Sequence, residues 1–418
     1  PPPGNARRID SAAAPVAPPL PAHEPPPGMD ALSQDTNFRR WPWLLVLTPL
    51  ALALLGLAGI ARGDELSGAG VLYDRQVIWL ALAAGAMWVG TRLPLRWLQQ
   101  TAWLWLLLSV GLLLLVYAFP PRWGSRRWIP LGLLYFQPSE LAKLTCIAAL
   151  ARLLSRSDHH RRLFGLIVPF LVTLVPLGLI LKEPDLGTSL LFLPVLYGML
   201  WTAGARGWHL LLIALLGVCL LPIFWSAISA EQQSRITAVF QQRDGAAPRQ
   251  GVADGYHLHQ SKQVLSFGGA WGSQSQGTLL DDPAAYYLPA CRTDFVLCMV
   301  GERFGLAGTL TTLFLYAVLS LSGLVVAGTS RDPFGRLLAV GVTVLLAAQT
   351  IINTGMTVGL VPITGITLPL MSYGGSSLLF TGLALGLLVQ VARQPHDPLA
   401  LPASISPRPR TSTAWQPG

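Results

Sequence analysis

Long apolar runs recur along this chain, and short polar connections separate them. Most runs approach the roughly 20 residues that an α-helix needs to cross a bilayer, and most Lys and Arg residues stand at their ends. The eighth run is longer than one span and includes a polar stretch from Gly301 to Gly305, so we expect a break or a strong tilt within it. The predicted helices cover Trp43–Ala61, Gln76–Leu93, Thr101–Phe119, Ser139–Leu154, Leu163–Leu181, Leu186–Gly204, Trp208–Ala230, Phe295–Gly328, Arg336–Leu360 and Met371–Ala392.

The composition supports this interpretation. The chain has 418 residues, is 52% hydrophobic and is only 12% charged, whereas soluble domains carry about 25% charged residues. We therefore predict an all-α polytopic membrane protein with about ten transmembrane helices and a large extracellular loop between the seventh and eighth. The net charge of +9 does not indicate a nucleic-acid partner, because no basic run is interleaved with aromatic residues.

Arginines beside the predicted helices orient the chain. Except in one connection, they fall on the same side of the membrane, and the positive-inside rule places that side in the cytoplasm together with both termini. The outer connections are then 62–75, 120–138, 182–185, 231–294 and 361–370. The orienting residues are Arg39, Arg40, Arg92, Arg96, Arg152, Arg156, Arg161, Arg162, Arg206, Arg331, Arg336 and Arg393.

Two Pro- and Ala-containing tails flank the membrane domain. Residues 1–38 lack the basic, apolar and cleavage regions of a signal peptide, and we expect them and residues 394–418 to form disordered cytoplasmic tails. Residues 39–393 then form the membrane domain, with 231–294 as its outer loop. A connection of that length is usually functional or disordered.

The connection 120–138 is the exception to the charge rule. It places Arg122, Arg126 and Arg127 on the outer side, together with Trp123 and Trp128. One interpretation is a set of interfacial anchors with an aromatic belt. The other is an anion site for a phosphorylated lipid, because the planar guanidinium suits phosphate oxygens.

Two further polar clusters open predicted helices on the same side. Glu140 and Lys143 share a helix face, so they form either a buried structural ion pair or the polar wall of a cavity at the outer leaflet. Asp185 stands at a helix N-terminus, where a carboxylate is favourable. It either caps that helix or positions a cation or an acceptor hydroxyl.

Asp294 lies where the long outer connection meets the eighth helix. It is a helix N-cap or a general base, because a carboxylate at that depth is partly desolvated and its pKa rises. We find no spacing of side chains typical of a metal site, and we treat His257 and His259 as ordinary loop residues.

Several of these motifs occur together in one known family. The chain resembles the shape, elongation, division and sporulation family, which includes RodA and FtsW, over roughly residues 40–393. Each motif alone is weak, but their shared order on one predicted side is a strong signal. The residues that carry the resemblance are Arg126–Ile129, Phe136–Lys143, Glu183–Thr188, Gln260-Ser261, Gly268-Gly269, Thr293–Phe295, Gly301-Glu302, Gln349, Asn353 and Ser372–Ser377.

The resemblance implies a peptidoglycan glycosyltransferase of the bacterial cytoplasmic membrane. Its substrate would be lipid II, and its partner a class B penicillin-binding protein that acts as a transpeptidase. Asp294 matches the family's essential acid. The matching residues expected to bind substrate are Arg126, Arg127, Glu140, Lys143, Asp185, Gln260, Ser261, Ser372 and Ser376.

The implied mechanism is inverting glycosyl transfer at the outer face. Asp294 would take the proton of the acceptor hydroxyl, and the leaving pyrophosphate would be stabilised by Arg126, Arg127, Lys143 or a divalent cation such as Mg or Mn, with no organic cofactor. A lipid II flippase is the main alternative, but it predicts polar groups at all membrane depths, whereas here they gather at one face. A non-catalytic scaffold would require Asp294 to be dispensable.

Two residues depart from the family pattern. Ala290 stands where the family often has an acidic residue, and Arg292 stands where it has His. Asp281 and Asp282 are candidates to supply the missing carboxylate.

Overall fold

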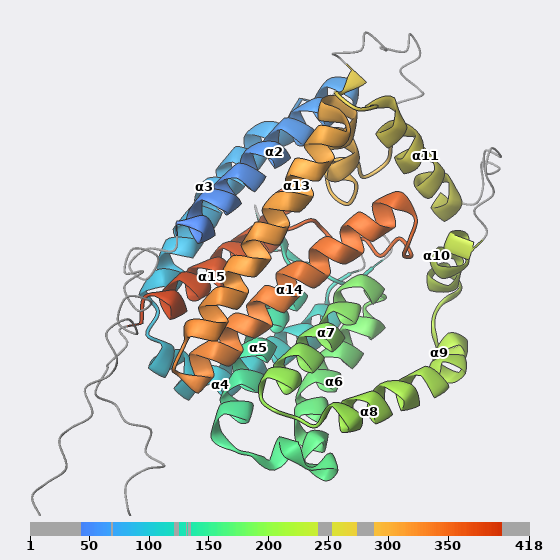
Figure 1. Cartoon of the computed structure of the whole chain (residues 1–418). Coiled ribbons are helices and arrows are strands. Elements are labelled where there is room, and N and C mark those ends of the chain that lie inside the picture. Colours follow the sequence, from blue (N-terminus) through green and yellow to red (C-terminus); the bar gives the residue numbers. More distant parts are fainter. Residues whose placement is uncertain are drawn as a thin grey trace, which may run out of the picture. The chain divides into compact units, whose positions relative to one another are not determined.

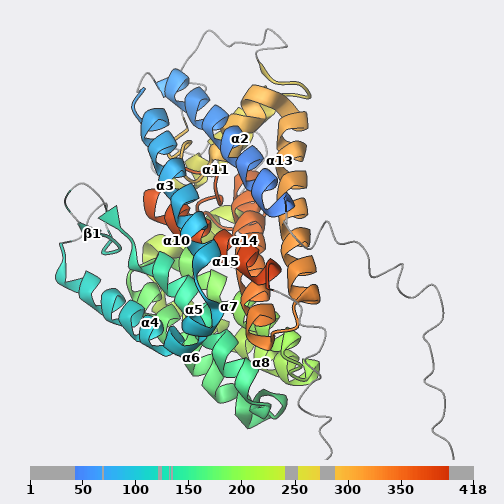
Figure 2. The same ribbon diagram turned by 90° about the vertical axis from the view of Figure 1, so that its left-hand side faces the viewer.

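In the computed structural model, the described part of the membrane domain is mainly helical (Figures 1 and 2). It describes residues 43–67, 70–120, 125–130, 132, 135–240, 253–273 and 288–394. The predicted tails lie outside the described residues except for Gln394, and so do Arg122, Trp123, Asp281 and Asp282.

Six described helices are long and apolar enough to cross a membrane, so the chain is a multi-pass membrane protein. The helices of the membrane domain are α2 (Leu44–Ser67), α3 (Leu72–Arg92), α4 (Leu95–Leu115), α5 (Pro138–Arg156), α6 (Ile167–Lys182), α7 (Leu186–Thr202), α8 (Gly207–Cys219), α9 (Leu221–Ala227), α13 (Val296–Thr329), α14 (Pro333–Val358) and α15 (Gly375–Ala392). Short 3₁₀ turns cover Val116–Ala118, His159–Arg161 and Leu163–Leu166, and strands β1 (Ile129–Pro130) and β2 (Tyr135–Phe136) pair antiparallel.

The structure corrects several of the predicted bounds. Helix α2 ends at Ser67 rather than at Ala61, α3 begins at Leu72 rather than at Gln76, and α4 begins at Leu95 rather than at Thr101. The seventh predicted helix divides into α8 and α9 after Cys219, because Pro222 in the first turn of α9 has no backbone N–H to continue the helix. The tenth begins at Gly375 rather than at Met371. The connection 231–294 is not a plain loop, because it contains the helices α10 (Ala230–Phe240) and α11 (Ala253–Phe267).

The expected break in the eighth helix is confirmed. Gly305 interrupts α13 with a φ of 68°, a left-handed conformation that favours glycine. The segment after α11 packs into this break, where the backbone N–H of Leu306 donates to the carbonyl of Gly269 at 2.9 Å. A side chain at Gly268 would collide with the carbonyl of Gly301. Glycine on both sides therefore lets the outer connection contact the α13 backbone.

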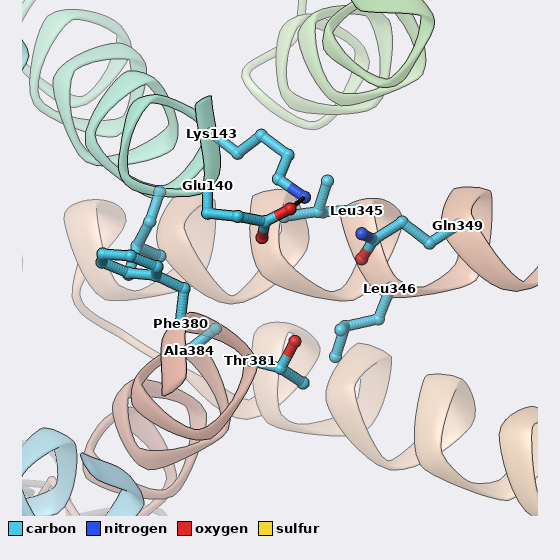
Figure 3. Close-up of a pocket in the computed structure, with 9 residues that line it drawn as sticks. Glu140, Lys143, Leu345, Leu346, Gln349, Phe380, Thr381 and Ala384 are labelled. Carbon is cyan, nitrogen blue, oxygen red and sulfur yellow. Dashed lines mark hydrogen bonds and ion pairs between the residues drawn. The ribbon is translucent and has the colours of Figure 1, made fainter. Parts of the chain in front are cut away.

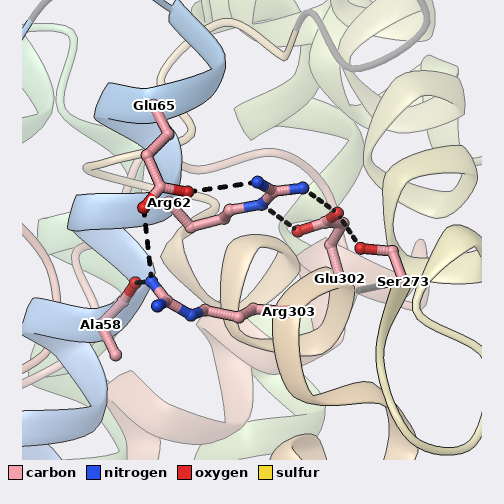
Figure 4. Close-up of polar contacts among 6 residues, drawn as sticks. All are labelled: Ala58, Arg62, Glu65, Ser273, Glu302 and Arg303. Carbon is pink, nitrogen blue, oxygen red and sulfur yellow. Dashed lines mark hydrogen bonds and ion pairs between the residues drawn. The ribbon is translucent and has the colours of Figure 1, made fainter. Parts of the chain in front are cut away.

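A buried ion pair lies beside the same break (Figure 4). Arg62 of α2 donates two hydrogen bonds of 2.8 Å to the carboxylate of Glu302, which is fully buried in α13. The hydroxyl of Ser273 donates to the same carboxylate. Because such bidentate pairs have strict geometry, this cluster fixes α2, α13 and the segment after α11 relative to one another.

Helix α14 occupies the centre of the bundle and contacts α5, α7, α13 and α15 (Figures 1 and 2). Most of its side chains are buried. By contrast, Leu210 is the buried residue of α8, whose other side chains are at least partly exposed, as expected beside lipid. The central position of α14 matters for the site, because its C-terminal half carries Gln349 and Asn353.

Candidate functional site

A tight turn before α13 carries Asp294. Ala290 has a φ of 54°, and its carbonyl oxygen accepts from the backbone N–H groups of Thr293, Asp294 and Phe295 at 3.0–3.2 Å. The side-chain amide of Asn353 donates to the carbonyl of Asp294 at 2.8 Å, and it also donates to the carbonyl of Ile366 at 2.7 Å. The Asp294 turn is therefore attached to α14 and to the connection before α15.

A second cluster lies at the start of α7. The Asp185 carboxylate accepts from the backbone N–H of Thr188 at 3.0 Å and from its hydroxyl at 2.9 Å, so it is the N-cap of this helix. The Arg127 guanidinium lies 3.8 Å from the same carboxylate. It also donates to the carbonyls of Glu183, at 3.1 Å, and of Pro184. Arg127 therefore rests on the turn that precedes α7.

The two clusters meet through the segment 364–366. A side chain at Gly187 would collide with the carbonyl of Thr364, so α7 packs directly on this segment. A Cβ at Gly365 would lie 3.6 Å from a carboxylate oxygen of Asp294. The start of α7 and the Asp294 turn therefore lie on the same short stretch of backbone.

The local charges act on the half-buried Asp294 carboxyl. Burial is the main cause that raises the pKa of Asp294 to about 6, and the negative charge of Asp185 adds to it. A hydrogen bond from Thr293 and the positive charges of Arg235 and Arg127 lower the pKa and oppose this effect. The result is a carboxylate that is ionised at neutral pH and is basic enough to accept a proton.

Glu183 is a buried carboxyl in the same turn that the sequence analysis named only as part of a motif. It is fully buried, and neither carboxyl oxygen has a hydrogen-bond partner among the described residues. Burial raises the pKa of Glu183 to about 8; the charge of Asp185 adds to the rise, and Arg127 opposes it. Glu183 is therefore mostly neutral at pH 7.

Glu140 and Lys143 form a buried pair at 2.9 Å on α5. The pair also lines a pocket between α5, α14 and α15 (Figure 3), so it is both an ion pair and a cavity wall. Gln349 lines the same pocket one helical turn before Asn353, so one face of α14 leads from this pocket toward the Asp294 turn. The other lining residues are Leu144, Leu345, Leu346, Phe380, Thr381 and Ala384.

The remaining predicted site residues either form hydrogen bonds with backbone groups of the surrounding segments or lie at the exposed edge of the site. Arg126 is exposed and donates to the carbonyl of Tyr117 at 3.3 Å. Ser261, next to the buried Gln260 on α11, donates to the carbonyl of Thr357 at 3.0 Å.

Two serines of the 372–377 signature also bond backbone groups. The Ser372 hydroxyl accepts from the backbone N–H of Leu368 at 2.8 Å. The Ser376 hydroxyl donates to the carbonyl of Tyr135 at 2.9 Å and accepts from the N–H of Gln137 at 3.3 Å. These two serines therefore shape the walls around the site.

Arg235 is a basic residue of the site that the sequence analysis missed. It lies on α10, and its charge lowers the pKa of Asp294. The signal available in the sequence was the amphipathic pattern of residues 230–240 inside the long outer connection. Within the described ranges, no group of three or more His, Cys, Asp or Glu side chains is arranged to hold a metal ion.

Comparison with known proteins identifies a family match over most of the chain. Residues 41–397 match the family model of FtsW, RodA and SpoVE, described as cell cycle protein. A protein of Alkalilimnicola ehrlichii, named probable peptidoglycan glycosyltransferase FtsW, is 35% identical over 89% of this chain and 93% of its own length. A protein of Marinobacter nauticus with the same name is 33% identical over 85% of this chain and 90% of its own length.

Solved structures resemble the fold as well. RodA of Thermus thermophilus, a rod shape determining protein, aligns with a TM-score of 0.62 at 29% identity, over 84% of this chain and 97% of its own. A chain from a peptidoglycan synthase complex that coordinates polymerisation and crosslinking aligns with a TM-score of 0.71 at 30% identity, over 84% of this chain and 98% of its own.

Glu183 should make the stability of the protein depend on pH. Its pKa rises from an ordinary value of 4.5 to about 8 in the folded state, so the folded protein binds this proton more tightly than the unfolded one. Stability from this group is complete below about pH 4.5 and is lost as the pH rises toward 8. Between about pH 5 and about pH 9 the wild-type Tm should fall as Glu183 loses its proton. Glu183→Gln has no such proton to lose, so the Tm of the purified variant should fall less over the same range.

The matched control is Asp158→Asn, which changes an exposed carboxylate. It should leave the pH dependence of Tm unchanged. If Glu183→Gln and wild type lose the same Tm over this range, Glu183 is not a neutral buried acid.

Proposed function

The chain belongs to the FtsW, RodA and SpoVE family of cell cycle proteins, the shape, elongation, division and sporulation family, and we propose on this basis that it polymerises lipid II into glycan strands. It is a peptidoglycan glycosyltransferase, the activity by which its curated relatives are named. It would act at the outer face of the cytoplasmic membrane during cell elongation or division.

The observation that carries the mechanism is that Asp294 is half-buried in a turn close enough to Arg127 and Asp185 for their charges to shift its pKa. A carboxylate with a pKa of about 6 is suited to accept the proton of a sugar hydroxyl at neutral pH. As that proton moves to Asp294, the acceptor oxygen forms a bond to the anomeric carbon of the donor. The bond from that carbon to the pyrophosphate breaks, the pyrophosphate keeps the electron pair, and the configuration inverts.

The leaving pyrophosphate gains negative charge and needs a cation beside it. Arg127 is the best placed of the predicted residues, because its guanidinium lies 3.8 Å from Asp185 on the turn that meets Asp294. Arg126 would contact the same group from the exposed side. Glu140 and Lys143 would contact part of a lipid-linked sugar from α5. Gln260, Ser261, Ser372 and Ser376 would shape the surrounding walls.

A divalent cation remains a separate hypothesis. Among the described residues, no three His, Cys, Asp or Glu side chains gather in one place, and the steps above are written without a metal. Polymer formation by protein treated with a chelator, with and without added Mg or Mn, tests whether a cation is needed.

The flippase alternative is not favoured by the relatives, which are named as glycosyltransferases. Lipid II confined to the outer leaflet of proteoliposomes distinguishes the two activities. Polymer should form there without any transport, and its absence would support a flippase.

The partner would be a class B penicillin-binding protein. A structural relative is part of a complex that coordinates polymerisation and crosslinking, and a membrane polymerase needs a transpeptidase nearby to crosslink its product. Affinity capture of the tagged protein from membranes should recover such a transpeptidase. Capture without one would argue against a stable complex.

Membrane orientation gives a direct test of the site's location. We expect ten spans, cytoplasmic termini and the connection with α10 and α11 outside. With Cys219 and Cys291 replaced by Ser, a Cys at Lys262 should react with an impermeant thiol reagent applied to spheroplasts. A Cys at Asp158 should react only after lysis, and the opposite labelling would place the site on the cytoplasmic side.

Asp294→Asn should nearly abolish polymerisation. Asn preserves the shape of the side chain but cannot accept the proton, so turnover should fall by about 10²-fold or more. Wild-type turnover should likewise decline as the pH falls below about 6, because Asp294 becomes protonated. Polymer length and yield from purified lipid II measure both effects.

Asp332→Asn is the control for this substitution. Asp332 caps α14 through the N–H groups of Phe334 and Gly335, and Asn caps about as well as Asp. It should therefore keep its turnover. A folded Asp294→Asn protein with near wild-type turnover would rule out the mechanism.

Arg127→Ala should weaken polymerisation more than Arg126→Ala. Loss of a charge-assisted contact to pyrophosphate is worth about 1–3 kcal/mol in kcat/KM, and only Arg127 is adjacent to Asp185. Arg127→Lys, which keeps the charge, should recover part of the loss. If Arg127→Ala retains wild-type kcat/KM at matched expression, Arg127 does not contact the donor.

A further inference from the structure

Arg292 stands two residues before Asp294 and forms an ion pair across the bundle. Its Nη1 atom lies 2.5 Å from a carboxylate oxygen of Asp64, near the C-terminal end of α2. The Asp64 side chain is 7% exposed and that of Arg292 is 21% exposed. The pair is therefore largely withdrawn from solvent, where a salt bridge is screened less than at the surface.

Both partners of this pair are attached to further elements. The second carboxylate oxygen of Asp64 accepts from the backbone N–H of Tyr73, in the first turn of α3, at 3.0 Å. The carbonyl of Arg292 accepts from the backbone N–H of Tyr373, just before α15, at 2.9 Å. Asp64 and Arg292 thus connect the Asp294 turn to α2, α3 and the segment before α15.

Close packing accompanies these hydrogen bonds. A Cβ at Gly63 would lie 2.9 Å from Cγ of Arg292 and 3.4 Å from Sγ of Cys291. Helix α2 therefore contacts both the aliphatic part of the Arg292 side chain and its neighbour. The turn therefore contacts α2 through Arg292 and Cys291, and α14 through the Asn353 amide.

We propose that Arg292, through its ion pair with Asp64, is a positioning residue for Asp294. The inference rests on the proposed role of Asp294 as the base. Within the turn, the backbone N–H groups of Thr293, Asp294 and Phe295 all donate to the Ala290 carbonyl, so contacts with the neighbouring helices help to set the orientation of the turn. A displacement of about 1 Å at a reacting group can cost up to about 10²-fold in rate.

The chain offers a control in Arg303, which also contacts α2 but from within α13 (Figure 4). Arg303 of α13 donates to the carbonyl of Ala58 at 3.2 Å and lies 4.0 Å from Glu65, so it also ties α13 to α2. These contacts do not involve the Asp294 turn. Arg303→Ala therefore removes an ion pair to α2 without releasing Asp294.

The test is a double-mutant cycle on the full-length protein with lipid II as substrate. The variants are Arg292→Ala, Asp64→Asn, their combination, and Arg292→Lys, with Arg303→Ala as control and Asp294→Asn measured alongside. Asn at position 64 can still accept from the Tyr73 N–H but carries no charge. Turnover is expressed per folded molecule, with Tm recorded for each variant.

Positioning predicts a loss in kcat with little change in KM. Arg292→Ala and Asp64→Asn should each lower kcat by about tenfold or more. The kcat of the double variant should be no lower than that of the less active single variant, because the two residues act as one unit. Arg292→Lys should recover most of the turnover. Arg303→Ala should have wild-type kcat even if its Tm falls.

Three results would overturn the proposal. These are wild-type kcat in Arg292→Ala, a loss confined to KM, or a double-variant loss equal to the product of the single losses. If Arg292→Ala does not fold, wild-type kcat in Asp64→Asn is equally decisive. Should Asp294→Asn itself remain active, the assignment of the base fails instead, and the two failures are thereby distinguished.

Discussion

Two non-helical backbone segments meet at Asn353, and the arrangement of the site depends on that junction. Irregular backbone is tolerated at membrane depth only where protein or a polar cavity satisfies its hydrogen bonds. The single Asn353 amide donates to Asp294 on one segment and to Ile366 on the other. Asn353 lies on the central and largely buried α14, so its two hydrogen bonds hold both segments in a fixed position relative to the core of the bundle.

The buried charges around this junction follow two physical patterns. Arg62 with Glu302, and Glu140 with Lys143, are close pairs in which each charge compensates the other. Among the described residues, the carboxyls of Glu183 and Asp294 have no ion pair this close, and burial raises the pKa of each. Structural pairs and proton-binding carboxyls are therefore distinguished by whether a cation lies in direct contact.

The outer connection contributes to the site as well as covering it. Helix α10 brings Arg235 close enough to influence Asp294, and the segment after α11 packs into the break at Gly305. The Arg62–Glu302 pair and the Arg292–Asp64 pair both begin at the same end of α2. Movement of that end would therefore affect the outer connection and the Asp294 turn together.

The sequence alone determined the class of protein, the positions of most helices, the break in α13 and the polar motifs of the site. These features are local: apolar length reflects bilayer thickness, and Gly305 reflects the conformation of one residue. The sequence did not determine which motifs meet. Helix packing brought Asp294 close enough to Asp185 and Arg127 for their charges to shift its pKa, and it paired Arg292 with a residue 228 positions earlier in the chain. It also left the Glu183 carboxyl without a hydrogen-bond partner among the described residues. These contacts between distant parts of the chain follow from the angles and distances at which the helices pack. No local pattern of hydrophobic and polar residues contains that information.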